Sequence, residues 1–155
     1  MLGVWHFSFT VSNLEQSIAF YKKLGLELLL TQEQANEYTS RLVGYDNAHL
    51  KVAQFVIPGQ PQGLSTHSLE LVEYVNPKGS RQPPDICNPG EAHLALAVTD
   101  IHERYAQLKK DGVQFFSPPN AITAGVNQGG YTCYFWDPDR IVLEMVQPPA
   151  HRLKT

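Results

Sequence analysis

Two stretches of the chain share one alternation of apolar and polar residues, and each is followed by a helical pattern. Residues 6–11 and 93–98 alternate at a period of two, which is typical of a half-buried β-strand. Apolar residues then recur at helical spacing up to Gly25 and Gly112, where a glycine commonly ends a helix. The apolar residues of these two patterns are Phe7, Phe9, Val11, Leu14, Ile18 and Tyr21 in the first stretch, and Leu94, Leu96, Val98, Ile101, Tyr105 and Leu108 in the second.

The two stretches are copies of one unit. They align without a gap at an offset of 87 residues, which places His6 on His93 and Gly25 on Gly112. Helix-start signals also recur, because Ser12-Asn13-Leu14-Glu15 reads as a capping box and Asp100-Ile101-His102-Glu103 as a weaker one. The chain therefore contains an internal repeat.

Each copy also ends in a similar strand. Leu69–Val72 and Leu143–Val146 are short β-type runs, and both are followed by proline. Further strands are predicted at Leu50–Ile57 and at Tyr131–Trp136, the second ending at the turn Asp137-Pro138-Asp139-Arg140. We therefore predict an α+β fold of two tandem βαβββ units, which form a curved mixed sheet, a cup, with helices on the outside. The predicted ranges are 1–76 for the first unit, 77–90 for a linker rich in proline and glycine, and 91–149 for the second unit, with one domain overall over 4–148.

Four polar residues occupy matched positions in this pattern. His6 and His93 lie on the polar face of each first strand, and Glu70 and Glu144 lie between apolar neighbours on each last strand. All four side chains should point to the concave side of the sheet. A buried carboxylate is costly unless it is paired or bound to metal. Imidazole and carboxylate suit Zn²⁺, Ni²⁺, Co²⁺, Mn²⁺ or Fe²⁺, so one divalent metal ion is predicted. The alternative is a polar network without metal.

Composition excludes several other classes of protein. A net charge of −3 does not favour binding to nucleic acid, which is itself negatively charged. No long apolar segment or basic leader is present, so neither membrane insertion nor export is expected, and a cytoplasmic protein is the default. Cys87 and Cys133 are expected to be neutral free thiols rather than a disulfide framework.

Three motifs together resemble the vicinal oxygen chelate superfamily, the glyoxalase, bleomycin resistance and dioxygenase group. They are H-x-x-F-x-V-S-N-L-x-x-S-I-x-F-Y-x-x-L-G-L from His6, A-H-L-A-L-A-V-x-D-I, and D-P-D-x-I-x-L-E-M-V-Q up to Gln147. Glyoxalase I has His, Glu, His and Glu at the positions of the four residues above, whereas related epimerases usually have glutamine at the position of Glu70. Thr10 and Tyr74 stand where bacterial glyoxalase I has glutathione-binding residues, which puts a glutathione site in doubt.

The resemblance implies a metal-dependent lyase or isomerase that moves a proton next to a metal-chelated carbonyl or enediolate of a small substrate. Either Glu70 or Glu144 would be the catalytic base. Ser8, Tyr134 and Trp136 have the parity to line the substrate pocket, and a place in the core is the alternative for the two aromatic residues. The segment Ala121–Tyr131 reads either as a substrate-covering loop or as an ordinary surface loop.

The family also supplies alternatives: an acyl-CoA epimerase, an Fe(II) extradiol-type dioxygenase, or a binding protein without catalysis. A fourth ligand at Glu70 would crowd the open positions that a dioxygenase needs. A homodimer is expected by resemblance, with the metal ligands drawn from one chain or from two.

Overall fold

The computed structural model describes residues 3–60, 63, 67–80 and 85–153, which fall into two units. One unit comprises residues 1–82 and the other residues 83–155, so the division lies within the segment 77–90. Each unit has its own mixed sheet and helices, which confirms the predicted α+β class and the predicted repeat of strands. No helix in the described part of the chain is long and apolar enough to cross a membrane.

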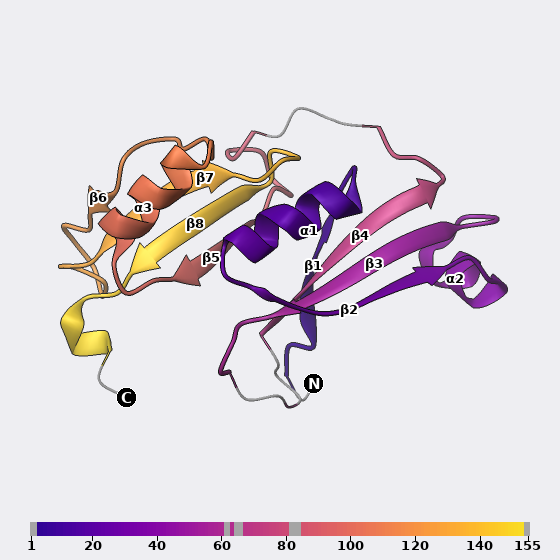
Figure 1. The fold of residues 1–155 in the computed structure, drawn as a ribbon, viewed down its shortest axis with the longest axis horizontal. Coiled ribbons are helices and arrows are strands. Elements are labelled where there is room, and N and C mark those ends of the chain that lie inside the picture. The colour runs from indigo at the N-terminus through magenta and orange to yellow at the C-terminus, as the bar shows by residue number, and fades with distance from the viewer. Residues whose placement is uncertain (1–2, 61–62, 64–66, 81–84, 154–155) are drawn as a thin grey trace. The chain divides into compact units, whose positions relative to one another are not determined.

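The first unit is built on a four-stranded sheet in the order β1-β4-β3-β2 (Figure 1). The β1 and β4 strands are parallel, and the other neighbouring pairs are antiparallel. The elements are β1 (His6–Thr10), α1 (Leu14–Lys23), β2 (Glu27–Gln34), α2 (Glu37–Val43), β3 (His49–Val56) and β4 (Ser68–Asn76). The third of these strands starts and ends one residue earlier than the prediction of Leu50–Ile57.

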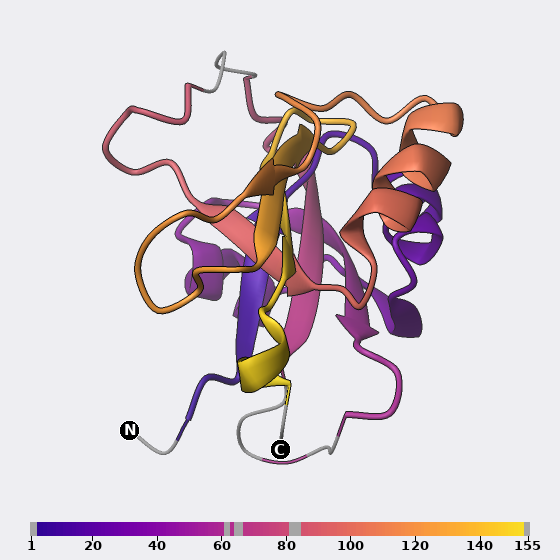
Figure 2. The same cartoon turned by 90° about the vertical axis from the view of Figure 1, so that its left-hand side faces the viewer.

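The second unit repeats this order, with its sheet arranged β5-β8-β7-β6. Helix α3 lies to one side of this sheet (Figure 2). The edge strand is reduced to two residues, whereas its counterpart in the first unit has eight. The elements are β5 (His93–Ala97), α3 (Ile101–Lys110), β6 (Asn120–Ala121), β7 (Tyr131–Trp136), β8 (Val142–Gln147) and the 3₁₀ turn η1 (Ala150–Arg152).

The repeated helices α1 and α3 end in the same way. Gly25 and Gly112 have φ angles of 86° and 85°, a left-handed conformation that glycine adopts without a steric penalty. The amide of Leu26 donates to the carbonyl of Tyr21, and that of Val113 to Leu108, which is the Schellman pattern in both helices. The predicted C-terminal glycines are thus confirmed.

The helix starts differ in one detail from the prediction. Asp100 caps α3 as expected, because its side chain accepts a hydrogen bond from the amide of Glu103. The prediction of Ser12 as the cap of α1 was wrong, since the cap is Asn13, whose Oδ1 accepts from the amide of Gln16 at 2.9 Å. Asparagine and serine are comparable caps, and the extended conformation at Asn13 lets the helix begin one residue later.

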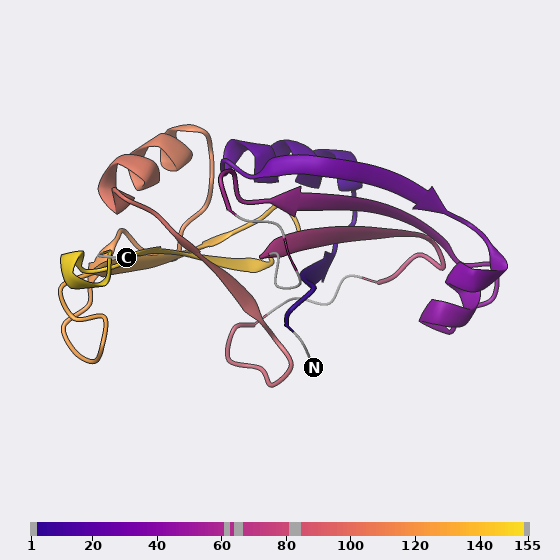
Figure 3. The ribbon, with the colours of Figure 1, turned by 90° about the horizontal axis from the view of Figure 1, so that it is seen from below.

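A further helix, α2, was not predicted from the sequence. It has only seven residues, is capped by Asn36 and ends at Gly44, which has a φ angle of 76°. Figure 3 shows α2 beyond the end of β2, with α1 against one face of the same sheet. The first unit is therefore βαβαββ rather than βαβββ, because the α2 turn is inserted between β2 and β3.

The core of each unit lies between its sheet and its long helix. In the first unit Tyr21 of α1 packs on Phe55 of β3, with ring centroids 6.0 Å apart, and both side chains are fully buried. In the second unit Phe135 of β7 is fully buried beside Phe115, and Leu108 of α3 is buried as well. Burial of these side chains removes one face of each sheet from solvent and leaves the opposite face for polar residues.

A short turn follows β8. Residues 150–152 form this 3₁₀ turn, η1. The guanidinium of Arg152 donates to Oδ1 of Asn127, which lies in the loop between β6 and β7. This loop is closed by hydrogen bonds in both directions between Ile122 and residues 129 and 130. An ordered loop satisfies its own backbone groups in this way.

Candidate metal centre

His6 and Glu70 meet on one face of the first sheet. The parallel register of β1 and β4 pairs His6 with Ser68 and Ser8 with Glu70. Because side chains alternate along a strand, all four share the face opposite α1. Nε2 of His6 is 3.6 Å from Oε1 of Glu70.

His93 and Glu144 form the matching pair in the second unit. The β5–β8 register pairs His93 with Val142 and Ala95 with Glu144, the same offset as in the first unit. Nε2 of His93 is 3.2 Å from Oε2 of Glu144. Two strand pairs from different parts of the sequence thus produce the same His–Glu arrangement.

The second oxygen of each carboxylate is held by a residue on the neighbouring strand. Gln54 of β3 donates from Nε2 to Oε2 of Glu70 at 3.2 Å. Thr132 of β7 donates from its hydroxyl to Oε1 of Glu144, and the same hydroxyl lies 3.0 Å from the carbonyl oxygen of Met145. Each glutamate is therefore oriented so that one oxygen faces the histidine and the other is occupied.

Both carboxylates are largely buried. Their side chains are 17% exposed for Glu70 and 15% exposed for Glu144, and the histidine is the one basic partner of each among the described residues. Two neighbours of Glu144 are buried or half-buried as well. Burial, with a smaller contribution from the charge of Glu144, raises the pKa of the Tyr134 phenol and raises that of the Cys133 thiol to about 11. Both groups are thus neutral at pH 7, as expected for Cys133.

The donor set fits a divalent metal ion. Two ligands that each lie about 2.0–2.2 Å from one metal are roughly 3.0–3.5 Å apart, and the measured His–Glu separations are 3.6 and 3.2 Å. Nδ1 of His6 is buried without a hydrogen-bond partner among the described residues, so this imidazole is not committed to a structural contact. Neither unit, within the described residues, adds a third His, Cys, Asp or Glu to its own pair. Each unit by itself therefore brings two donor side chains together.

A third His–Glu pair, His49–Glu33, lies outside the repeated pattern. His49 of β3 contacts Glu33 of β2, but Glu33 is 58% exposed and the pair has no counterpart in the second unit. Glu73, next but two after Glu70, lies on the opposite face and accepts from the amide of Leu14 at the start of α1. Glu73 therefore holds the start of α1 rather than joining the His6–Glu70 pair.

The three predicted pocket residues lie in different surroundings. Ser8 is exposed and is register partner to Glu70, and Tyr134 packs edge-on against His93 with centroids 5.3 Å apart. Trp136 instead stacks on Phe116 at 3.9 Å, and the Arg140 guanidinium lies 4.4 Å from its ring. Ser8 and Tyr134 are thus neighbours of the His–Glu pairs, whereas Trp136 lies with a second group of aromatic residues.

Sequence reasoning missed Gln54 and Thr132. Gln54 follows Leu50 and Val52 at alternate positions, so a polar side chain on a face that is otherwise apolar was a usable signal. Thr132 gave no such signal, because threonine is common in strands. Its contact with Glu144 depends on the β7–β8 register.

Comparisons with known proteins find similar sequences over almost the whole chain. The model of the Glyoxalase/Bleomycin resistance protein/Dioxygenase superfamily matches residues 3–145. A curated relative, 2-epi-5-epi-valiolone epimerase from an Actinomyces species, is 32% identical over 96% of this chain and 81% of its own length.

Solved structures show the same fold at low sequence identity. A glyoxalase family protein from Bacillus cereus has a TM-score of 0.81 at 21% identity, over 97% of this chain and 96% of its own. Glyoxalase I from Leishmania major has a TM-score of 0.64 at 18% identity, over 92% of this chain and 84% of its own.

Proposed function

The chain belongs to the Glyoxalase/Bleomycin resistance protein/Dioxygenase superfamily, and on that basis we propose that it is a metal-dependent isomerase or lyase. In this proposal His6, Glu70, His93 and Glu144 together hold one divalent metal ion, Zn²⁺, Ni²⁺, Co²⁺, Mn²⁺ or Fe²⁺. The observation that carries the proposal is the recurrence of one His–Glu pair in one register in both units, with the second carboxylate oxygen fixed each time. The ligands come together within one chain or across a homodimer, and equilibrium sedimentation at micromolar concentration distinguishes a dimer from a monomer.

The residues of this site are suited to moving a proton on carbon. A divalent metal bound by them would polarise a substrate carbonyl and stabilise the negative charge that develops when the adjacent C–H bond is broken. A glutamate accepts that proton and returns it to the same or to the neighbouring carbon. Gln54 and Thr132 keep one oxygen of each carboxylate occupied, so the other oxygen, which faces the histidine, is available to the metal ion or to a proton.

Epimerisation is the version of this chemistry that we favour. The 32% identical relative is an epimerase, and the repeat provides two glutamates in equivalent positions, Glu70 and Glu144. One carboxylate removes the proton from one face of the carbon, and the proton returns on the other face. The substrate class is a small molecule with a C–H bond beside a carbonyl. Glyoxalase-type isomerisation, with return to the neighbouring carbon, is the second candidate, because all four ligand types match glyoxalase I.

Solvent deuterium tests this proposal directly. Metal-reconstituted protein in D₂O, incubated with 2-oxoaldehyde hemithioacetals, α-epimeric acyl-CoA thioesters and α-hydroxy ketones, should incorporate deuterium at the carbon next to one carbonyl. NMR or mass spectrometry detects the exchange. If one of these ligands binds tightly but exchanges no proton with the metal-loaded protein, the binding-protein alternative replaces the enzyme.

Thr132 is expected to tune the metal site without being a ligand. Changing Thr132→Val removes the hydroxyl that donates to Glu144 and should weaken metal affinity about tenfold, the usual size of an outer-shell effect. Competition with a chromophoric chelator measures the affinity. Thr132→Ser keeps the hydroxyl and should restore most of it. Equal affinities for wild type and Thr132→Val would show that this hydrogen bond does not orient a ligand.

A further inference from the structure

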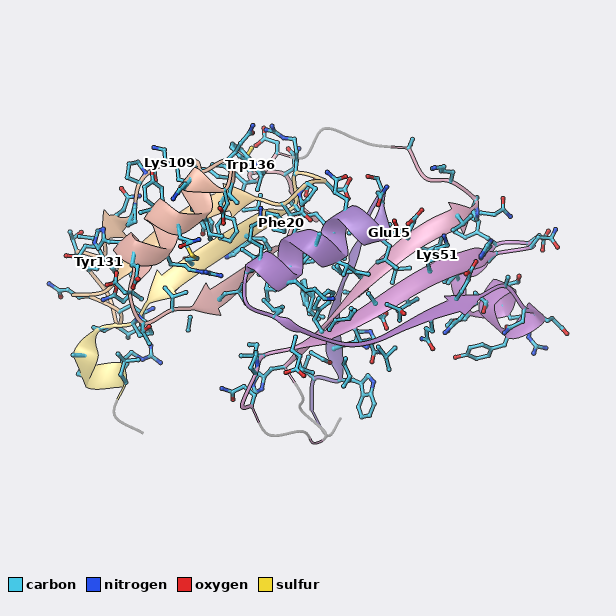
Figure 4. All side chains as sticks on the ribbon, viewed as in Figure 1. Glu15, Phe20, Lys51, Lys109, Tyr131 and Trp136 are labelled. Atoms are coloured by element: carbon cyan, nitrogen blue, oxygen red, sulfur yellow. The ribbon has the colours of Figure 1, made fainter. Side chains whose placement is uncertain are left out.

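A second site lies in the second unit, beside the C-terminal half of α3. It is a cavity of about 450 Å³, a volume typical of small-molecule sites. Its walls come from α3, from residues 113–118 and from Trp136, and neither His93 nor Glu144 lines it. Lys109 and Trp136, both labelled in Figure 4, belong to this wall. The cavity is thus distinct from the metal-ligand pair.

The cavity forms where an edge strand is interrupted. Residues 114–116 run antiparallel to β7, with the amide of Trp136 donating to Gln114 and that of Phe116 to Tyr134. Pairing with β7 resumes at Asn120. Pro118 and Pro119 lie between these points, and proline has no N–H to donate to a ladder. The chain therefore leaves the sheet edge at Ser117 and Pro118, which line the cavity.

Four of the nine residues that line the cavity are aromatic. Phe116 and Trp136 are stacked with centroids 3.9 Å apart and an interplanar angle of 27°. Tyr105 and Phe115 meet edge-on at 4.6 Å. Four rings around one cavity favour a flat, unsaturated ligand, because ring pairs gain from stacked and edge-on geometries.

The charged side chain in the cavity lining is that of Lys109. Nζ of Lys109 donates to the hydroxyl of Tyr105 at 3.0 Å, which places the ammonium at the rim. The guanidinium of Arg140 lies on the Trp136 ring. No carboxylate of the described residues forms an ion pair with either cation, and no acidic residue lines the cavity. An anionic group on the ligand would therefore meet unneutralised positive charge.

We propose that this cavity binds a small planar aromatic ring that carries a carboxylate. The ring lies against Phe116, which is 41% exposed, and the carboxylate reaches Lys109 at the rim. The site works independently of the metal centre, so it binds its ligand whether or not metal is present.

Calorimetric titration of the full-length, chelator-treated protein with 2-naphthoate tests the proposal. Binding is expected, with Kd raised about fivefold in Lys109→Gln, as for a partly solvated ion pair. Lys110→Gln is the matched control, because Lys110 follows on the same helix, is exposed and does not line the cavity. Phe116→Leu should weaken binding of the ring by a similar factor, since it removes the stacking surface.

Two further measurements separate this site from the metal centre. Neutral 2-naphthalenemethanol should lose nothing in Lys109→Gln, which would assign the effect to the charge. His93→Ala should leave 2-naphthoate binding unchanged. Absence of binding, equal losses in Lys109→Gln and Lys110→Gln, or a loss confined to His93→Ala would each overturn the proposal, and the last would place the ligand at the metal centre.

Discussion

Glu144→Ala is expected to abolish metal binding and, with it, proton exchange on the substrate. The carboxylate is 15% exposed and 3.2 Å from Nε2 of His93, so alanine removes one of the four proposed ligands and leaves the imidazole without its partner. Metal affinity should fall by more than ~100-fold, beyond the range seen for outer-shell changes. Elemental analysis after purification should find about one equivalent of metal in the wild type and none in the variant.

Glu73→Ala is the matched control for this experiment. Glu73 is also a strand glutamate of the repeat, but its carboxylate accepts from the amide of Leu14 on the other face of the sheet. Its loss should cost about 1 kcal/mol of stability, as for a helix cap, and leave the metal content unchanged. Metal retained in Glu144→Ala at the wild-type level would remove Glu144 from the ligand set. No metal in the wild type even after reconstitution would favour the binding protein.

The repeat explains why so much of the fold could be predicted. The alternation in residues 6–11 and 93–98, the helical spacing and the glycines at 25 and 112 are local signals, and each reports its own element. Because the same signals occur in both copies of the repeat, a prediction made in one copy is supported by the other. The helix α2 escaped prediction because seven residues hold too few turns for an apolar period, although Asn36 and Gly44 provide the cap residues at both ends.

Only part of the candidate site could be predicted from local signals. Parity alone predicted that each histidine and glutamate share a face, because only the alternation within each strand is needed. The partners of the carboxylates depend on pairing between strands: Gln54 meets Glu70 and Tyr134 is opposite Glu144 only in the observed registers. Register is set by packing across the whole sheet. Trp136 shows the limit of parity, since it has the expected face but stacks on Phe116, which the alternation did not indicate.

Pairing of strands also accounts for the likeness of the two His–Glu pairs. Each histidine is opposite a residue two positions before the glutamate, Ser68 in one unit and Val142 in the other. This shared offset puts the imidazole diagonally beside the carboxylate in a parallel ladder. A one-residue slip in either unit would move the glutamate to the helix-covered face. The apolar residues before the glutamates hold this register. Leu69 is 3% exposed and Leu143 is fully buried, and a slip would move both side chains into solvent.

Phe135→Ala is expected to destabilise the protein by about 3–5 kcal/mol, a large part of the 5–15 kcal/mol typical of a domain. The Phe135 side chain is fully buried, lies 5.3 Å from the ring of Phe115 and pairs across the ladder with Leu143. Phe55 is its counterpart in the first unit, equally buried and paired with Leu69. Phe55→Ala should therefore cost a similar amount. Urea unfolding followed by far-UV circular dichroism, with chelator present so that metal adds no stability, measures both.

The two variants together test whether the units depend on each other. Units of roughly 75 residues bury little core alone, so we expect one unfolding transition that either variant moves to lower urea concentration. Val126→Ala is the control, because Val126 is 77% exposed and its loss should change stability by less than ~0.5 kcal/mol. Two separate transitions, each moved by one variant only, would show that each unit folds by itself. A cost below about 1 kcal/mol for Phe135→Ala would contradict the buried position assigned to this ring.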